Sequence, residues 1–259
     1  YHREGRYPLE LPFIPGQEGA GVIEEIGAAV SGWSIGDRVA WAMVPSSYAE
    51  YVSVPARLLA RIPAGVSEEL AAAVMLQGLT AHYLVTSVYA ADQTTTAVVH
   101  AAAGGVGLLL AQMLKARGAT VIGTVSSEEK VARALEAGAD HVIRYDEEPW
   151  EEKTRELVGD KKVDVVYDGV GQSTFEAGLT VLRARGLMAL YGAASGAVPP
   201  FDLQRLNGLG SLVITRPSLG DFVRTPDELA WRVGDIFDAV QSGTLSVAIA
   251  KTLPLDDAA

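Results

Sequence analysis

The sequence predicts an α/β fold built on a parallel sheet that helices cover on both faces. From residue 96 onward, short continuous apolar runs alternate with helical segments, as is typical of parallel strands buried on both sides. A glycine-rich turn at 101–107 lies between the first of these strands and the helix that follows. The first 62 residues contain short strands and loops instead. We therefore expect a doubly wound, Rossmann-type sheet and a second, mostly β unit.

The segments before residue 96 are predicted from short apolar runs between glycines and prolines. Strands are expected at 20–26, 38–41 and 48–54. The composition changes at Ser67, which we expect to be the N-cap of an alanine- and leucine-rich helix over 68–84.

The α/β part is predicted to contain six strands and the helices between them. The strands are expected at 97–100, 120–125, 141–143, 163–167, 187–191 and 211–214. The helices are expected at 108–117, from the end of the second strand to Gly138, and at 175–182.

A last helix is predicted to begin at Thr225. Thr225 and Glu228 have the spacing of a capping box, and Pro226 stands at the first helical position. We expect this helix to run to about Gln241 and a strand to follow over 246–253. Both ends of the chain are abrupt, so we expect the sequence to be part of a longer protein.

The composition excludes several classes of function. The formal charge is −11, so the average field repels nucleic acid and anionic membranes. The chain has no cysteine, which excludes disulfides, thiolate nucleophiles and cysteine-ligated zinc. We recognise no leader and no apolar run near the about 18 residues that a membrane span needs. We expect a soluble, cytoplasmic protein without a nucleic-acid or membrane partner.

The turn at 101–107, Ala-Ala-Ala-Gly-Gly-Val-Gly, predicts a dinucleotide site. A pyrophosphate binds at the N-terminus of the first helix of a strand–helix–strand unit, where N–H groups are unpaired. Glycines allow the tight turn and the close approach of the phosphate. The alternative is a structural turn whose small residues serve packing alone, but the strand before and the helix after favour the dinucleotide.

The end of the second strand predicts which dinucleotide binds. Enzymes that use NAD usually place an acidic residue there for the ribose hydroxyls, but no Asp or Glu occurs between Gly107 and Ser127. Ser126 takes that place, and Lys130 follows where a cation can meet a 2′-phosphate. Glu128 argues for NAD. Two alternatives stay open: Ser126 can be an N-cap with Glu129, and Lys130 can be a solvated surface residue.

Five segments together resemble the quinone oxidoreductase (zeta-crystallin-like) branch of the medium-chain dehydrogenases/reductases. The resemblance covers nearly the whole chain. The segments that carry it are 27–39, 76–84, 100–107, 167–171 and 214–219.

The resemblance implies a GroES-like substrate domain at 1–75, lacking its N-terminal part, and an NADPH-binding Rossmann domain at 76–215. A return segment at 216–259 lacks its C-terminal part. It also implies cofactor-binding residues, and Tyr1 is a candidate for hydrogen bonding an acceptor carbonyl, unless it is a disordered terminus. The implied cofactor-binding residues are Thr80, Gly104, Gly105, Val106, Gly107, Ser126, Lys130, Tyr145, Gly192, Ala193 and Ser195.

Zinc is argued against on the residues themselves. Zinc-dependent relatives carry a histidine in a Gly-His-Glu motif, where this chain has Gly16, Gln17 and Glu18. The four histidines have no ligand-like spacing. We therefore predict no metal and no Lewis acid for alcohol oxidation.

The function expected from the resemblance is the metal-independent transfer of reducing equivalents from NADPH to a quinone. One alternative is a zinc-free reductase of enones or enoyl thioesters, including an enoylreductase domain of a synthase. Another is a non-catalytic NADPH-binding protein. The resemblance also implies a homodimer through the edge strand at 211–214, because an apolar edge strand needs cover.

Overall fold

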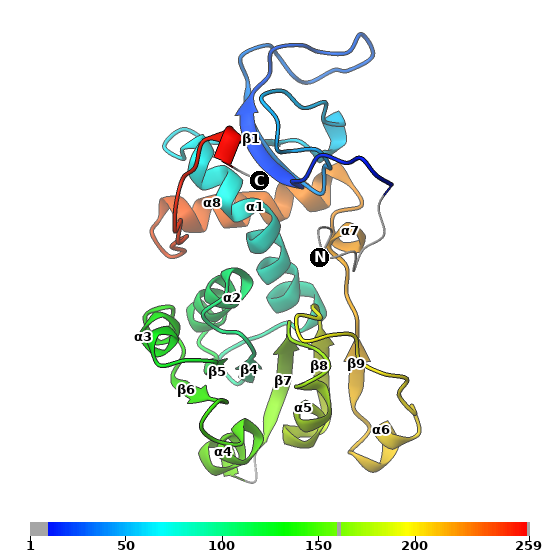
Figure 1. Ribbon diagram of the computed structural model, residues 1–259, viewed down its shortest axis with the longest axis vertical. Coiled ribbons are helices and arrows are strands. Elements are labelled where there is room, and N and C mark those ends of the chain that lie inside the picture. The colour runs from blue at the N-terminus through cyan, green and yellow to red at the C-terminus, as the bar shows by residue number, and fades with distance from the viewer. Residues whose placement is uncertain (1–9, 160–161, 258–259) are drawn as a thin grey trace. The chain divides into compact units, whose positions relative to one another are not determined.

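The computed structural model describes residues 10–159 and 162–257, and the chain falls into two units. One unit is Tyr1–Leu79 with Phe222–Ala259, and the other is Thr80–Asp221. Figure 1 labels most of the helices and strands of both units. The predicted domain boundaries after residues 75 and 215 lie near these limits but stay predictions.

The second unit contains a six-stranded parallel sheet in the order β6-β5-β4-β7-β8-β9. The strand order reverses between β4 and β7, which is the point where open α/β sheets bind ligands at the carboxyl ends of their strands. All six predicted strands and the predicted fold class are confirmed. The strands are β4 Thr96–Val99, β5 Thr120–Val125, β6 His141–Arg144, β7 Val163–Asp168, β8 Leu182–Leu190 and β9 Val213–Thr215.

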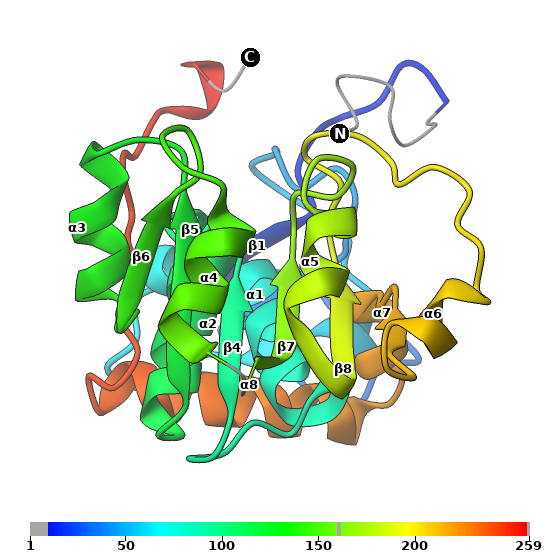
Figure 2. The same cartoon turned by 90° about the horizontal axis from the view of Figure 1, so that it is seen from below.

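Helices cover both faces of this sheet. Two of them, α4 and α5, lie side by side in front of the strands in Figure 2, and α2 lies behind them. The helix α4 was not predicted, because residues 146–156 are charged and carry little apolar periodicity. The helices are α2 Gly105–Ala116, α3 Glu129–Glu136, α4 Trp150–Val158, α5 Phe175–Val181, and the short α6 Arg205–Gly208 and α7 Leu219–Phe222.

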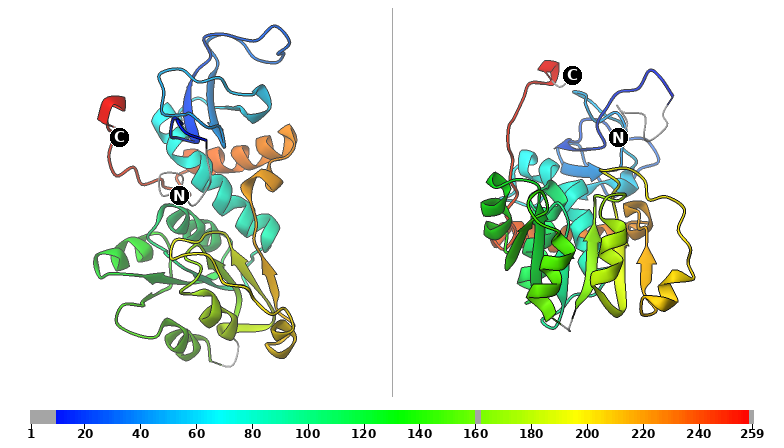
Figure 3. Two further views of the ribbon diagram at one scale, coloured as in Figure 1. Left: turned by 45° about the vertical axis from the view of Figure 1, so that its right-hand side comes forward. Right: turned by 60° about the horizontal axis from the view of Figure 1, so that its bottom comes forward.

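The core of the second unit explains why its strands have continuous apolar sequences. Val98, Ile122, Val166 and Met188 come from neighbouring strands and are fully buried. Phe175 from α5 packs against the same cluster. Figure 3 shows the strands between the two layers of helices from two further sides. The four strand side chains lie on one face of the sheet. Most of the residues that alternate with them along the strands are also fully buried, so both faces are removed from water, as the sequence predicts.

The first unit contains an antiparallel sheet in the order β1-β2-β3. The predicted capping box is present, because Thr225 accepts a hydrogen bond from the Glu228 N–H and Glu228 accepts one from the Thr225 N–H. Ser67 caps the helix that begins at Glu68, where its hydroxyl accepts a hydrogen bond from the Leu70 N–H at 3.2 Å. The elements of this unit are β1 Glu18–Val22, β2 Arg38–Ala42, the 3-10 helix Ala56–Leu58, β3 Ala60–Arg61, α8 Pro226–Gln241 and the 3-10 helix Leu255–Asp257. The helix α1 Glu68–Tyr83 begins in this unit and ends in the second, where the π-helix Leu84–Val88 follows it.

Two predicted strands are wrong. Residues 48–54 form no strand, and none of the three strands of this sheet pairs with them. Val52 and Val54 still pack by their side chains against the small cluster that contains Trp41. Residues 246–253 form no strand either, and most of this segment is exposed. Alternating apolar residues predict a strand only where a neighbouring backbone can pair with it.

We expected no apolar segment long enough to span a membrane, but one helical stretch has this length and composition. Residues Glu68–Val88 are long and apolar enough to cross a membrane by length and composition. However, 56% of the most apolar window is buried within the structure. The buried core helix of a soluble protein has the same properties, so this stretch is weak evidence for a membrane span.

Candidate cofactor-binding site

The glycine loop follows the carboxyl end of β4 and forms a tight turn. Ala101 has a φ of +53°, and the Gly104 N–H donates to the Ala101 carbonyl oxygen at 2.8 Å. The helix α2 begins at Gly105, three residues earlier than predicted, and no side chain caps its first turn. Gly104 and Gly105 are exposed. The loop therefore presents an open helix N-terminus, which favours an anion.

Two glycines allow the loop to pack closely on the sheet. A Cβ on Gly107 would lie 2.3 Å from the Ala101 carbonyl oxygen and 2.8 Å from the Ala102 Cα. A Cβ on Gly123 of β5 would lie 2.8 Å from the Ala102 Cβ. The sequence analysis singled out Gly107 but not Gly123, which lies in an otherwise apolar strand. Both positions need glycine because backbone or Cβ atoms fill the space a side chain would take.

The resemblance implies that Ser126, Lys130 and Tyr145 bind the 2′-phosphate; Ser126 and Tyr145 directly follow β5 and β6, and Lys130 lies in α3. The strands pair in parallel, with Val125 opposite Arg144, so Ser126 and Tyr145 follow at the same edge. The Lys130 ammonium donates to the Ser126 hydroxyl at 2.7 Å. The Tyr145 side chain is 42% exposed. The structure thus brings these residues to one edge of the sheet.

The two structural alternatives for Ser126 and Lys130 do not hold. The helix α3 begins at Glu129 with Glu128 as its N-cap, and no side chain caps it. Ser126 is therefore not the first residue of a capping box. Lys130 is only partly exposed and is bonded to Ser126, so it is not a freely solvated lysine.

Arg144 ends β6 and lies among three carboxylates. It pairs with Glu128 at 3.0 Å, Asp146 at 2.9 Å and Glu147 at 2.6 Å. Its own side chain is 22% exposed. Hydrogen bonds from Arg144 lower the pKa of Asp146 below its ordinary value. Nothing in the local sequence around Arg144 predicted this arrangement.

The loops after β7 and β8 bind each other. Asp168 is fully buried and accepts hydrogen bonds from the Val170 and Gly171 N–H groups at 2.7 and 2.9 Å and from the Thr174 hydroxyl at 2.8 Å. The Ser195 hydroxyl donates to the Val170 carbonyl at 2.9 Å. Asp168 therefore caps a turn, as its place after a strand suggests.

Gly192 and Ala193 lie in the same pair of loops. A Cβ on Gly192 would lie 2.3 Å from the Gly169 carbonyl oxygen. The Ala194 N–H donates to that same Gly169 oxygen at 3.2 Å. The segment 192–195, which contains the predicted residues Gly192, Ala193 and Ser195, is thus held against the carboxyl end of β7, beside the switch point of the sheet.

His100 lies directly before the glycine loop and is fully buried. Its Nδ1 is 2.8 Å from the Thr124 hydroxyl, and its ring meets Trp150 edge to face at 4.4 Å between centroids. Burial lowers the pKa of His100 to about 4, although the nearby charge of Asp168 opposes this shift. A neutral imidazole is therefore part of the core under the loop, as expected for a core histidine.

Thr80 and Tyr1 are two further predicted residues. Thr80 is partly buried near the end of α1. Tyr1 lies outside the described residues.

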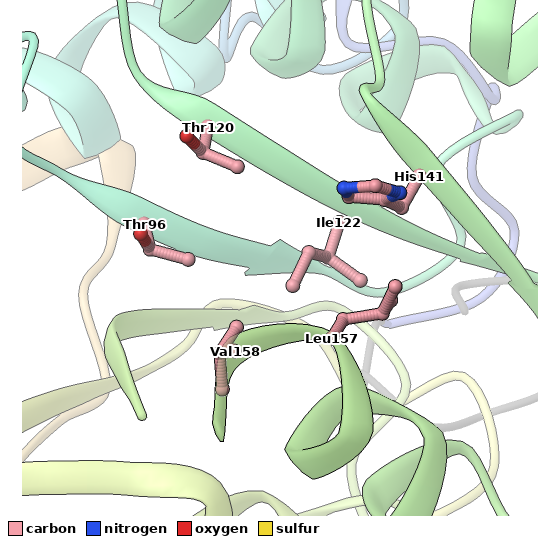
Figure 4. Close-up of a pocket in the computed structure, with 6 residues that line it drawn as sticks. All are labelled: Thr96, Thr120, Ile122, His141, Leu157 and Val158. Atoms are coloured by element: carbon pink, nitrogen blue, oxygen red, sulfur yellow. The ribbon is translucent and has the colours of Figure 1, made fainter. Parts of the chain in front are cut away.

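A cavity of about 290 Å³ lies in the second unit at the opposite edge of the sheet (Figure 4). Thr96, Thr120 and His141 begin three of its strands, and Leu157 and Val158 of α4 also line it. Because dinucleotides bind at the carboxyl ends of such strands, this cavity is not the cofactor site.

Two family models match the chain. A model described as the alcohol dehydrogenase GroES-like domain matches residues 1–64, and one described as zinc-binding dehydrogenase matches residues 105–232. Together with the parallel sheet, these matches define the medium-chain dehydrogenase/reductase class and confirm the predicted combination of folds.

Similarity to curated proteins narrows this class. The quinone oxidoreductase of Salmonella typhimurium is 44% identical over 253 residues, which are 97% of this chain and 77% of that protein. This chain belongs to the quinone oxidoreductase family, so the family predicted from its motifs is confirmed. The 2-haloacrylate reductase of a Burkholderia species is 39% identical over 267 residues, covering 100% of this chain and 80% of that protein.

A solved structure of the quinone oxidoreductase of Escherichia coli, complexed with NADPH, has the same fold. It is 43% identical, with a TM-score of 0.94, over 96% of this chain and 77% of that chain.

The zinc in the description of one family model does not decide the chemistry of this chain. The sequence has no cysteine. Among the residues that the structure describes, no three His, Cys, Asp or Glu side chains form a group able to hold a metal. Independence from zinc stays a prediction.

Proposed function

We propose that this chain transfers reducing equivalents from NADPH to a quinone-type acceptor without a metal. The observation that carries the proposal is the uncapped N-terminus of α2 under the glycine loop, with the Ser126–Lys130 pair at the next strand end. The first feature suits a pyrophosphate and the second suits a 2′-phosphate. The NADPH complex of the Escherichia coli relative supports this choice of cofactor.

The residues present fit this cofactor. The N-terminus of α2 at Gly105 and Val106 offers N–H groups, and the exposed Gly104 has no side chain to keep a phosphate away, while the buried Gly107 lets the loop pack closely on the turn before it. When bound, NADPH supplies a hydride. We assign the 2′-phosphate to Ser126, Lys130 and Tyr145, the nicotinamide end to Thr80, and the contacts after β8 to Gly192, Ala193 and Ser195.

The protein itself then has little covalent chemistry to perform. A quinone is electrophilic, so holding donor and acceptor together supplies much of the acceleration. We propose that residues 76–215 form the cofactor-binding domain and that residues 1–75 form the substrate domain, which contributes the acceptor side. Residues 216–259 would then return to the substrate domain. Tyr1 would donate a hydrogen bond to a carbonyl oxygen of the acceptor. A Tyr1→Phe variant with higher KM or lower kcat for a quinone, and an unchanged Kd for NADPH, would support its role.

The cofactor assignment is tested by equilibrium binding. Isothermal titration calorimetry with NADPH and NADH should give a Kd at least about tenfold lower for NADPH, as one charge-assisted phosphate contact implies. Equal affinities would contradict the assignment. Binding of NADPH without turnover of any acceptor would favour a non-catalytic role.

A second function, reduction of an activated carbon–carbon double bond, is favoured by the similarity to the 2-haloacrylate reductase. The two are separated by NADPH oxidation in the presence of an ortho-quinone, a para-quinone and a 2-alkenal. We expect turnover of a quinone. Turnover of the alkenal alone would replace our proposal with this alternative.

We further propose a cytoplasmic homodimer that pairs through β9. This strand lies at one edge of the sheet, bonded to β8 on one side, and its Val213 is 48% exposed. An apolar edge strand is a template for pairing with a second copy. Sedimentation equilibrium should give twice the 27.3 kDa chain mass, and a monomer mass would contradict the dimer.

A further inference from the structure

The Arg144 cluster, which consists of Arg144, Glu128, Asp146 and Glu147, borders the residues we assign to the 2′-phosphate. Glu128 is two residues after Ser126, and Arg144 directly precedes Tyr145. Two of the three carboxylates are strongly exposed, with side chains of Glu128 79% and of Glu147 60% accessible. An arriving phosphate therefore meets this cluster at the same strand ends.

Glu128 is the one acidic residue that argued for NADH in the sequence. An acid after the second strand accepts hydrogen bonds from ribose hydroxyls and repels a 2′-phosphate, which carries a charge of about −2 near neutral pH. In the structure its carboxylate instead accepts a hydrogen bond from the Arg144 guanidinium at 3.0 Å. The pair joins positions 16 apart in the sequence, because β5 and β6 are neighbours.

The guanidinium of Arg144 bonds Asp146 and Glu128 through different nitrogens, so it can keep the Glu128 carboxylate in place. The guanidinium donates to both oxygens of Asp146, from Nε at 3.4 Å and from Nη2 at 2.9 Å. This leaves Nη1, which bonds Glu128 and Glu147. The turn also places Asp146 and Glu147 around the arginine, since the Glu147 N–H donates to the Arg144 carbonyl. The arginine is therefore fixed on one side by Asp146 while it holds Glu128 on the other.

We propose that Arg144 determines cofactor specificity by holding Glu128 in an ion pair, away from the ribose, so that a 2′-phosphate is accepted there. The inference rests on the proposed NADPH site. Arg144 is a positioning residue, acting through Glu128. Without Arg144, Glu128 would lose this ion pair and be free to accept from the ribose hydroxyl of NADH.

The test is a double-mutant cycle on the full chain, read as Kd for NADPH and for NADH by calorimetry at low ionic strength. We expect Arg144→Gln to weaken NADPH binding about fivefold, the scale of an exposed ion pair, and to leave NADH binding equal or tighter. Glu128→Gln alone should change NADPH binding less than about twofold. Adding Glu128→Gln to Arg144→Gln should restore the NADPH affinity, and Arg144→Lys should keep most of it.

A matched control removes the same charge elsewhere. Arg205→Gln breaks the exposed ion pair with Glu176 on the same unit and should leave both affinities unchanged. The melting temperature of each variant without cofactor reports any loss of folding. The NADPH difference between wild type and Arg144→Gln should also shrink in high salt.

The outcomes separate this inference from the proposed function. If the double variant binds NADPH as weakly as Arg144→Gln, Arg144 does not act through Glu128 and the inference is wrong. If the wild type prefers NADH or binds neither cofactor, the proposed function fails, whatever Arg144→Gln does.

Discussion

Two pairs of loops follow the carboxyl ends of strands in the parallel sheet. They differ in whether their polar groups are bonded within the protein or remain accessible. The loops after β7 and β8 satisfy these groups internally, through the buried Asp168 and the Ser195 hydroxyl. The loops after β4 and β5 leave them accessible, at the uncapped start of α2 and at the Ser126–Lys130 pair. The first pair fixes the shape of the edge, and the second offers groups to a ligand.

This comparison predicts which variants lose stability and which lose affinity. Removing a group that is bonded inside the protein leaves its partners buried without a hydrogen bond, which destabilises the fold. Removing an accessible group that is proposed to contact a ligand weakens ligand binding and leaves the stability of the fold largely unchanged. A glycine that packs beneath an accessible loop affects both stability and ligand affinity, because its close packing also sets the shape of the loop.

The largest effect is expected for Gly107→Ala. The new Cβ would meet the backbone of Ala101 and Ala102 at 2.3 and 2.8 Å, so the free energy of unfolding should fall by about 3 kcal/mol. Binding of NADPH should weaken with it. Urea denaturation and calorimetry measure the two. Gly234→Ala in α8 is the control, since apart from its own helix backbone no atom lies within 4 Å of its Cβ position. The free energy of unfolding of this variant should stay unchanged or rise by up to about 1 kcal/mol.

The second effect is expected on the pH dependence of stability, through His100, which directly precedes the glycine loop. The pKa of His100 is lowered to about 4 from its ordinary 6.5, so the unfolded chain binds more protons between these values. Stability should therefore fall as pH drops from 6.5 to 4, by about 3 kcal/mol, and this group adds no further change below pH 4. His100→Asn should flatten this part of the stability profile, measured by urea denaturation at several pH values. The exposed His141→Asn is the control and should leave the slope as it is.

A smaller loss of stability is expected for Asp168→Ala in the internally bonded loops. Three donors would lose their acceptor, which should cost about 2 kcal/mol in the free energy of unfolding. Asp202→Ala is the control, because its exposed carboxylate accepts from the Gln204 N–H in a surface turn; its cost should stay under about 1 kcal/mol. Equal costs for the two would remove the distinction between the loops.

The smallest change in stability, with a clear change in affinity, is expected for Lys130→Ala. Its side chain bonds a surface hydroxyl, so the melting temperature should stay near that of the wild type. The Kd for NADPH should rise about tenfold, since one charge-assisted bond to the 2′-phosphate is lost, and that for NADH should not change. The exposed Lys153→Ala, which loses an ion pair with Glu156, should change neither. A large loss of stability in Lys130→Ala would place this lysine with the structural loops.

The sequence predicted most of the second unit because its signals are local. Apolar runs between glycines gave all six strands, and the glycine spacing located the start of α2 to within three residues. Strand 48–54 was wrong because its alternating pattern says nothing about whether a neighbouring strand is available. The helix α4 was missed because its buried Trp150 and Thr154 stand among charged residues.

By itself, the sequence determined the family, the doubly wound sheet and the glycine loop, since each depends on residues close together in the chain. Whether Ser126 caps a helix or bonds Lys130, and whether Glu128 is free or paired, was decided by the tertiary structure. The physical reason is the parallel register of β5 and β6, which places Arg144 opposite Val125. Strand pairing joins distant segments, so the charges that surround a site depend on neighbours that local patterns do not specify.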